Sequence, residues 1–190
     1  MPRAGLTPER IAATAAEVAD AVGLERLTLA AVAQRLGVSG PAIYKHRAGL
    51  DELQRDVAVL AVRELTAELS AATVGRAGRD ALHALADAYR AYAKRHPGRI
   101  AASVRAPSDP EHIAASDAAL AVLNGVLRGY GLENDVDALR TLRAGLHGFV
   151  VLELAGGFGL PRDVDATYER YVDALDAGLR SSKSSRTASK

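Results

Sequence analysis

The stretch that decides the fold is residues 28–53, which read TLAAVAQRLGVSGPAIYKHRAGLDEL. Thr28 predicts the start of a short helix, because its hydroxyl can accept a hydrogen bond from a free backbone N–H. Gly37 can take the positive φ that ends this helix. Ser39 follows so closely that the helix it begins must cross the first one at a steep angle.

Two further positions complete a helix-turn-helix pattern. Ala33 is small where the two helices touch, and Ile43 can pack the second helix back onto the first. This packing leaves the other face of the second helix free to enter a DNA major groove. The outward-facing residues are Gly40, Pro41, Ala42, Tyr44, Lys45 and His46. The pattern therefore predicts a recognition helix, and the alternative is a tight helix corner in an ordinary all-α protein.

The rest of the chain is also predicted to be helical. Thr7, Pro8 and Glu9 favour the start of a first helix, Gly23 its end, and a longer helix follows from about Leu50. Glycines and prolines break the remaining helical pattern at 75–78, 97–98, 107–110, 129–131 and 156–161. We therefore expect an all-α fold of about nine helices. Its predicted parts are a three-helix DNA-binding domain at 1–56, a larger helical effector-binding and dimerisation domain at 57–180, and a disordered basic tail at 181–190.

Composition narrows the function. Aromatic residues make up 4% of the 190 residues, so the core must consist mainly of Ala, Leu and Val. The chain has no Cys, no HExxH, no phosphate-binding glycine loop and no GxSxG, so we expect neither an enzyme nor a cofactor or metal site. Because the net charge is only +1, any attraction for DNA must come from a local basic cluster such as Lys45, His46 and Arg47. Without a membrane-spanning run or a secretory signal, a cytoplasmic protein is expected.

Residues 7–57 resemble the DNA-binding region of TetR/AcrR-family transcriptional regulators, through the cap, the LGVS turn and the Tyr-x-His ending. The resemblance implies that Thr28 and Tyr44 contact phosphates, that residues 40–42 and Lys45 lie against base edges, and that His46 bonds the DNA backbone. Arg47 stands where the family usually has an apolar residue, and Leu50 where it often has a phosphate-binding lysine. Arg47 is thus a candidate for the missing phosphate contact. The predicted DNA-binding set is Thr28, Ser39, Gly40, Pro41, Ala42, Tyr44, Lys45, His46 and Arg47.

Residues 135–179 resemble the C-terminal domain of a TetR subgroup named for a Trp-His-Gly signature, read here as Leu146, His147 and Gly148. The resemblance implies that the last two long helices form a four-helix homodimer interface. The stripe that suits this interface is Tyr168, Tyr171, Val172, Leu175 and Leu179, although the same side chains could cover the monomer's own core. A dimer would place two recognition helices on a palindromic operator.

Three polar residues are candidates for an effector pocket. Tyr89, Asn124 and His147 lie at mid-helix on apolar faces, where either a bound small molecule or an internal hydrogen bond must satisfy them. His83 and His112 are interpreted as surface or capping residues. The predicted function is a repressor that a small molecule releases from its operator, and the alternative is a helical ligand- or protein-binding module that does not bind DNA. Effector, operator and sign of regulation are not specified by these residues.

Overall fold

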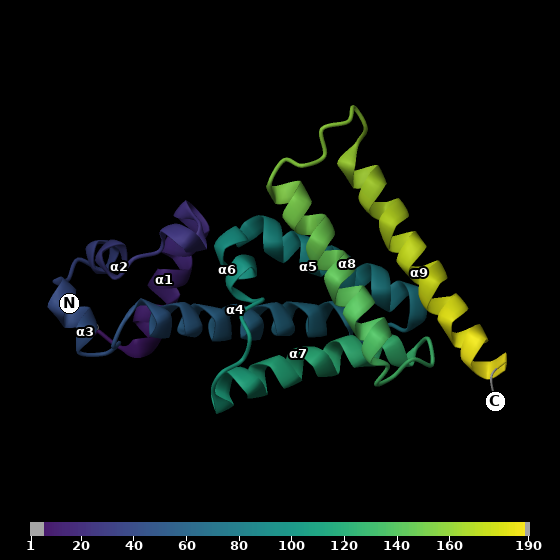
Figure 1. Cartoon of the computed structure of the whole chain (residues 1–190), viewed down its shortest axis with the longest axis horizontal. Coiled ribbons are helices and arrows are strands. Elements are labelled where there is room, and N and C mark those ends of the chain that lie inside the picture. The colour runs from purple at the N-terminus through teal and green to yellow at the C-terminus, as the bar shows by residue number, and fades with distance from the viewer. Residues whose placement is uncertain (1–5, 189–190) are drawn as a thin grey trace. The chain divides into compact units, whose positions relative to one another are not determined.

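The computed structural model describes residues 6–188, and every regular element in this range is a helix (Figure 1). The all-α prediction is confirmed, with nine α-helices and one 3₁₀ turn in the described part of the chain. The elements are α1 Pro8–Val22, the 3₁₀ turn Leu24–Arg26, α2 Leu29–Leu36, α3 Gly40–Tyr44, α4 Leu50–Thr73, α5 Gly78–Arg95, α6 Pro97–Ala102, α7 Pro110–Arg128, α8 Val136–Leu154 and α9 Val164–Ala188.

The chain forms two compact units, and the division between them is not a single point in the sequence. The N-terminal unit consists of the chain up to Glu64 together with Arg95–Asp117. The C-terminal unit consists of Leu65–Lys94 and the chain from Ala118 onward. The first unit thus extends beyond the predicted boundary at residue 56 and includes α6 and the first turns of α7.

Caps and turns define the helices of the N-terminal unit where the sequence predicts them. The Thr7 hydroxyl accepts a hydrogen bond from the Arg10 N–H at 3.3 Å, and the Thr28 hydroxyl accepts one from the Ala31 N–H at 3.1 Å. Gly37 has a left-handed φ of 67° at the end of α2. A side chain with a Cβ is strained in this conformation, so glycine is the residue that allows the chain to turn directly into α3.

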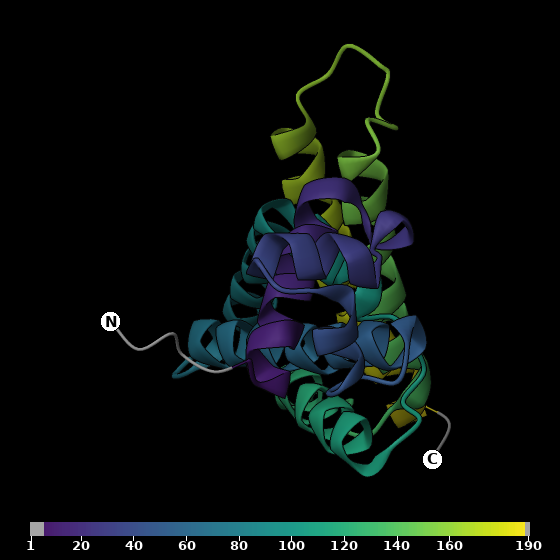
Figure 2. The same ribbon diagram turned by 90° about the vertical axis from the view of Figure 1, so that its left-hand side faces the viewer.

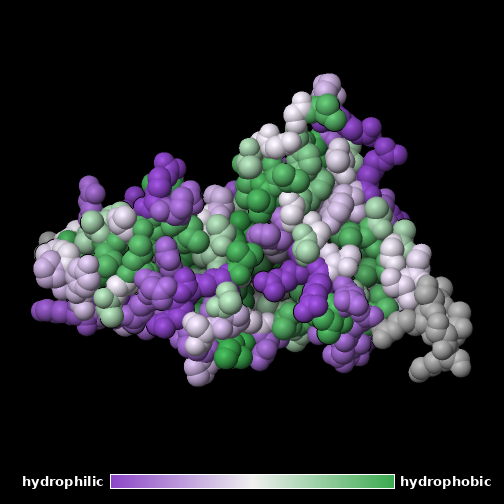
Figure 3. Space-filling model, in the orientation of Figure 1, coloured by the Kyte–Doolittle hydropathy of each residue, from purple (hydrophilic) through white to green (hydrophobic). Residues whose placement is uncertain are grey.

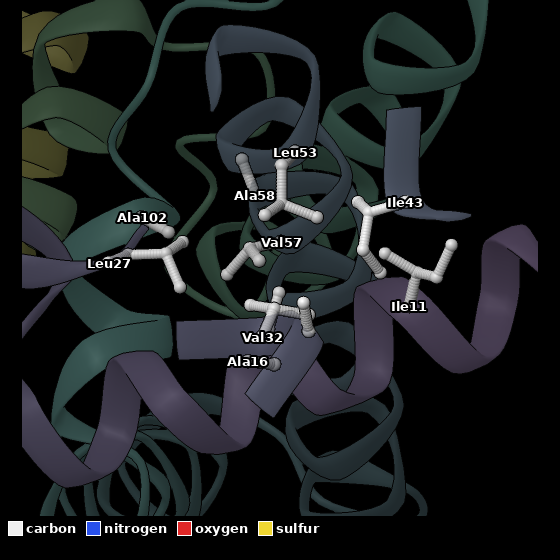
Figure 4. Packing of buried hydrophobic residues seen from close by; sticks show 11 residues of the cluster. Ile11, Ala16, Leu27, Val32, Ile43, Leu53, Val57, Ala58 and Ala102 are labelled. Carbon is white, nitrogen blue, oxygen red and sulfur yellow. The ribbon is translucent and has the colours of Figure 1, made fainter. Parts of the chain in front are cut away.

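The core of the N-terminal unit joins α1, α2, α3 and α4 (Figure 4). Ile43 is fully buried and Ala33 nearly so, which confirms the packing predicted from their spacing. Leu53 and Val57 are the contributions of α4, and both are fully buried. Burial of such aliphatic side chains contributes roughly 1.5–3 kcal/mol each. The short helix α3 is therefore held by the core that Ile43 joins.

Helix α6 packs directly on α1 through a glycine. A Cβ built on Gly98 would lie 2.1 Å from the carbonyl carbon of Ala19, so no larger residue fits at this backbone contact. The neighbouring Asp20 accepts a hydrogen bond from the Arg99 backbone N–H at 2.9 Å and lies 3.1 Å from the His96 Nδ1. Asp20 therefore caps the start of α6 from another helix, which explains why residues 95–117 belong to the N-terminal unit.

In the C-terminal unit, α8 and α9 form an antiparallel pair (Figures 1 and 2). Phe149 anchors this pair, with ring centroids of Tyr168 at 4.9 Å and Tyr171 at 5.3 Å. Arg90 of α5 donates two hydrogen bonds to the Glu153 carboxylate, at 2.6 and 2.7 Å. Aromatic packing and a bidentate ion pair thus fix α8 within its own unit.

Helix α9 continues to Ala188, so residues 181–188 are helical where the sequence predicts the start of a disordered tail. The hydroxyls of Ser181 and Ser182 donate to the carbonyls of Ala177 and Gly178, each at 3.0 Å. This stretch contains no Gly or Pro, so nothing in it ends the helix. The last two residues of the predicted tail, 189–190, lie outside the described residues.

None of the helices in the described range is both long enough and apolar enough to cross a membrane.

Candidate nucleic-acid interface

Helix α3 divides its few residues between the core and the solvent. Ile43 is fully buried, whereas Pro41, Tyr44 and Lys45 are exposed, with 59% of Tyr44 accessible. Gly40, Ala42 and His46 are half-buried and lie beside these residues along the chain. A large aromatic side chain and an ammonium group thus point away from the only core that this short helix has in the described structure.

The two predicted cap residues differ in how they use their hydroxyls. The Thr28 hydroxyl accepts the Ala31 N–H, and Thr28 is exposed at the start of α2. Ser39 is also exposed and occupies the N-cap position of α3, but its side chain makes no capping hydrogen bond in the described structure. Ser39 can therefore offer both its donor and its acceptor to an external group.

Arg47, a predicted phosphate contact, is turned toward carboxylates of its own unit rather than toward this exposed face. Its Nε donates to the Asp56 carboxylate, and one terminal nitrogen donates to the His46 carbonyl at 2.8 Å. A second carboxylate, that of Glu52, lies 3.8 Å away, and 16% of the Arg47 side chain is exposed. Burial raises the pKa of Asp56, and the hydrogen bond from Arg47 acts in the opposite direction. Arg47 thus secures the connection from α3 to α4.

The start of α4 carries no basic side chain in place of the usual lysine. Leu50 is exposed there, and the Glu52 carboxylate accepts the Ala48 backbone N–H at 2.6 Å. This carboxylate occupies an amide that would otherwise be free at a helix start. Lys45, the C-cap of α3, is therefore the exposed cation that stands nearest to the recognition helix in sequence.

The three candidate pocket residues have partners within the C-terminal unit. The Tyr89 hydroxyl lies 2.8 Å from the His147 Nδ1, and burial lowers the pKa of His147, which favours a neutral imidazole. The Asn124 side-chain oxygen accepts the Asn134 backbone N–H at 3.1 Å, next to the left-handed φ of 60° at Asn134. Of the two alternatives for these polar groups, the internal hydrogen bond is present at all three.

The predicted dimer stripe on α9 splits into two groups. Tyr168, Val172 and Leu179 are 2%, 1% and 4% exposed and fill the core of their own unit, so they have no surface to give to a second chain. Tyr171 and Leu175 are half-buried and keep part of their surface. Most of this amphipathic stripe thus packs inside its own chain. The three buried residues are core residues, not the dimer contacts that the resemblance implies.

Helix α8 has an exposed face that the sequence stripe on α9 did not include. Figure 3 shows apolar surface over the C-terminal end of α8, where Val151, Leu152 and Leu154 are exposed. The small residues Ala144 and Gly148, earlier in the helix, and Ala155, its C-cap, are exposed as well. Ala144, Gly148, Val151 and Ala155 are spaced by four, three and four residues, which is a helical face that the sequence alone could have revealed.

Comparisons with known proteins agree with this geometry. Residues 11–53 match the model of bacterial regulatory proteins of the tetR family, and residues 82–175 match that of the tetracyclin repressor-like C-terminal domain. The uncharacterized HTH-type transcriptional regulator Rv0681 of Mycobacterium tuberculosis is 38% identical over 181 residues, which cover 93% of this chain and 83% of that protein. The chain belongs to the TetR family.

Two further similarities extend the comparison. The uncharacterized HTH-type transcriptional regulator YobS of Bacillus subtilis is 32% identical over 94% of this TetR-family chain and 95% of its own length. The structure of a TetR variant from Acinetobacter baumannii in complex with minocycline has a TM-score of 0.71 at 23% identity, covering 94% of this chain and 99% of that one. The latter similarity concerns the fold. This chain is accordingly a DNA-binding transcriptional regulator, and its named relatives are regulators too.

The structure also shows what the residue patterns do not reveal in this TetR-family chain. His112, which we interpreted as a surface or capping residue, is fully buried in α7. The resemblance assigns Arg47 to DNA, whereas in the structure its partner is the carboxylate of Asp56, nine residues later. A helix-turn-helix pattern identifies the recognition helix, but it does not reveal which of the polar residues nearby are used inside the protein.

Proposed function

We propose that this TetR-family regulator is a cytoplasmic, homodimeric repressor that a small molecule releases from a palindromic operator. The observation that carries the proposal is the surface of α3, which buries Ile43 and exposes Tyr44 and Lys45. The helix has a single buried residue, so an aromatic hydroxyl and, at its C-cap, an ammonium group stand together on a surface that an external ligand can reach.

The chemistry of this surface suits a DNA groove. The Lys45 ammonium can donate to guanine O6 and N7 or to a phosphate, and the Tyr44 hydroxyl can reach a phosphate. Ala42 can place its methyl group against a thymine methyl, while Gly40 and Pro41 let the backbone approach the base edges. Thr28 and Ser39 add hydroxyls at the starts of α2 and α3. Arg47 holds this surface in place through its bonds to the Asp56 carboxylate and the His46 carbonyl.

A dimer interface on α8 and α9 accounts for the exposed apolar face of the C-terminal unit. Its core would consist of Gly148, Val151 and Leu152 of α8 with Tyr171 and Leu175 of α9. Small residues let helices approach closely, and exposed aliphatic groups supply the apolar area that a homodimer buries. Because one short recognition helix reads only a few base pairs, two copies about one helical turn apart give a site of useful specificity.

Effector release follows from the dimer. A ligand that binds more tightly to one spacing of the two DNA-reading units shifts the population toward that spacing and away from the operator. Tyr89 and His147 could bind such a ligand only by exchanging their mutual hydrogen bond for bonds to it. Membership of the Trp-His-Gly subgroup stays a prediction; Leu146, at the tryptophan position, is buried.

The test is binding to duplex DNA from the region upstream of the gene, measured by fluorescence anisotropy at several salt concentrations. We expect wild-type affinity to fall steeply with salt, and Lys45→Ala to weaken binding and reduce the slope of log K against log salt by about one. Arg128→Ala is the control, since it removes an exposed charge from the end of α7 and should leave the slope unchanged. Salt-independent or absent binding to every upstream duplex would favour the alternative of a module that does not bind DNA.

A further inference from the structure

His112 is a fully buried histidine whose two ring nitrogens have no hydrogen-bond partner among the described residues. It lies in the first turns of α7, in the N-terminal unit. The buried positions that follow it on α7 are apolar, among them Ala115, Leu123 and Val126. At helical spacing, His112 therefore occupies a position of the core-facing stripe where every buried neighbour is aliphatic.

Two ion pairs place this turn of α7 alongside α4. Asp109 accepts the backbone N–H of His112 at 3.0 Å, and its carboxylate lies 3.4 Å from the Arg55 Nε. Glu111 pairs with Arg63 at 2.8 Å. The stretch of α4 between the two arginines includes Val59 and Val62, both buried. The buried residues on this stretch of α4 and those that follow His112 on α7 are thus aliphatic, and two carboxylate–arginine pairs lie beside them.

A buried imidazole without partners is unfavourable as a purely structural element. A neutral ring carries one N–H donor and one acceptor, and burial removes both from water without replacing the bonds. A leucine at this position would pack without that penalty. Such a residue is best explained by a bound group that completes its hydrogen bonds.

The surroundings of His112 restrict what that group can be. The carboxylates of Asp109 and Glu111 are each balanced by an arginine, so they attract neither an anion nor a cation, and the aliphatic residues favour an uncharged, apolar body. A hydroxyl both donates and accepts, so it can bond either ring nitrogen in either tautomer. We propose that His112 anchors the hydroxyl group of a small, uncharged, largely apolar molecule that binds between α7 and α4 in the N-terminal unit.

Entry of the molecule requires the first turn of α7 to separate from α4. The Arg63–Glu111 pair is largely exposed and the Arg55–Asp109 pair partly so, and pairs of this kind add little stability. This inference deepens the proposed function, because the bound molecule would act within the same unit as the recognition helix. It locates the ligand away from Tyr89, Asn124 and His147.

The test compares phenol with toluene, two molecules of similar size of which only phenol has a hydroxyl. Melting temperatures are measured without DNA for wild type, His112→Leu and the control Ser116→Ala, one turn further along α7. We expect phenol to raise the melting temperature of wild type and of Ser116→Ala clearly more than toluene does. In His112→Leu the two molecules should have equal effects, and the unliganded variant should melt higher than wild type.

A second variant separates recognition from folding. His112→Gln keeps a donor and an acceptor, so it should retain a preference for phenol even if His112→Leu fails to fold. Equal responses to phenol and toluene in wild type, or a phenol preference that survives in His112→Leu, would overturn the proposal. Operator binding by the unliganded proteins is measured separately, so a failure of the ligand site leaves the DNA-binding proposal intact, and a failure to bind DNA leaves the melting data interpretable.

Discussion

Helices α3 and α9 both carry side chains that their sequence patterns assign to a partner, but they differ in how the monomer uses them. On α3, Tyr44 and Lys45 are exposed, as predicted. On α9, Tyr168, Val172 and Leu179 are buried in their own unit. A helix of five residues has one core position to fill, whereas a helix of 25 residues must cover a long stretch of its own core before any side chain remains for a partner.

The comparison teaches that exposure is easier to predict when a helix is short and its packing residue is known. Ile43 uses the one face of α3 that the core can reach, so the remaining residues have to face outward. An amphipathic stripe on a long helix shows only that its residues are buried by something. Whether those residues pack against their own chain or against a second copy depends on the helices that lie beside the stripe.

The largest expected effect concerns the unit that carries α3, at the joint between α6 and α1 inside it. Gly98→Ala should destabilise the protein by about 3 kcal/mol, because its Cβ would collide with the backbone of Ala19. Urea denaturation measures the loss. Gly125→Ala is the matched control: a Cβ there meets open space, so stability should rise by about 0.5–1 kcal/mol. Equal stability of the two variants would mean that α6 does not pack on α1 as described.

The second prediction tests which face of the C-terminal unit forms the dimer. Val151→Glu should weaken dimerisation about a hundredfold, since it places a charge at the centre of the proposed apolar interface. Sedimentation velocity across a range of protein concentrations measures the change. Val136→Glu is the control, because Val136 is an exposed aliphatic residue at the other end of the same helix. A Val151→Glu dimer as stable as wild type would move the interface away from α8.

The third prediction distinguishes a structural arginine from a phosphate contact. Arg47→Ala should lower the free energy of unfolding by about 2 kcal/mol, because the partly buried Asp56 loses its partner. Combining it with Asp56→Ala should recover part of the loss. The slope of operator affinity against salt should stay at the wild-type value. A slope reduced by about one unit, as expected for Lys45→Ala, would instead restore Arg47 to the set of phosphate contacts.

The smallest expected effect concerns a single hydroxyl on α3. Tyr44→Phe should weaken operator binding by about fivefold, corresponding to roughly 1 kcal/mol for one lost hydrogen bond to a phosphate. The melting temperature should not change, because Tyr44 is exposed. Anisotropy titration at fixed salt gives the affinity. Unchanged affinity would remove the Tyr44 hydroxyl from the DNA contacts.

Prediction from the sequence was most successful where a residue acts on its near neighbours in the chain. Thr7, Thr28 and Gly37 begin or end helices at the expected positions, because caps and left-handed turns involve only neighbours in the chain. It was least successful for polar side chains with distant partners. Tyr89 and His147 are 58 residues apart in sequence, and nothing in either local pattern indicates that they bond each other.

The sequence by itself determined the all-α class, the helix-turn-helix and the outward face of α3, since these depend on periodicity, caps and the spacing of Ala33, Gly37 and Ile43. Only the tertiary structure decided that Asp20 caps α6, that Arg47 belongs to Asp56, and that His112 is buried without a partner. The physical reason is range: local conformation follows from neighbouring residues, whereas hydrogen-bond partners and burial follow from segments that meet only after the chain has folded.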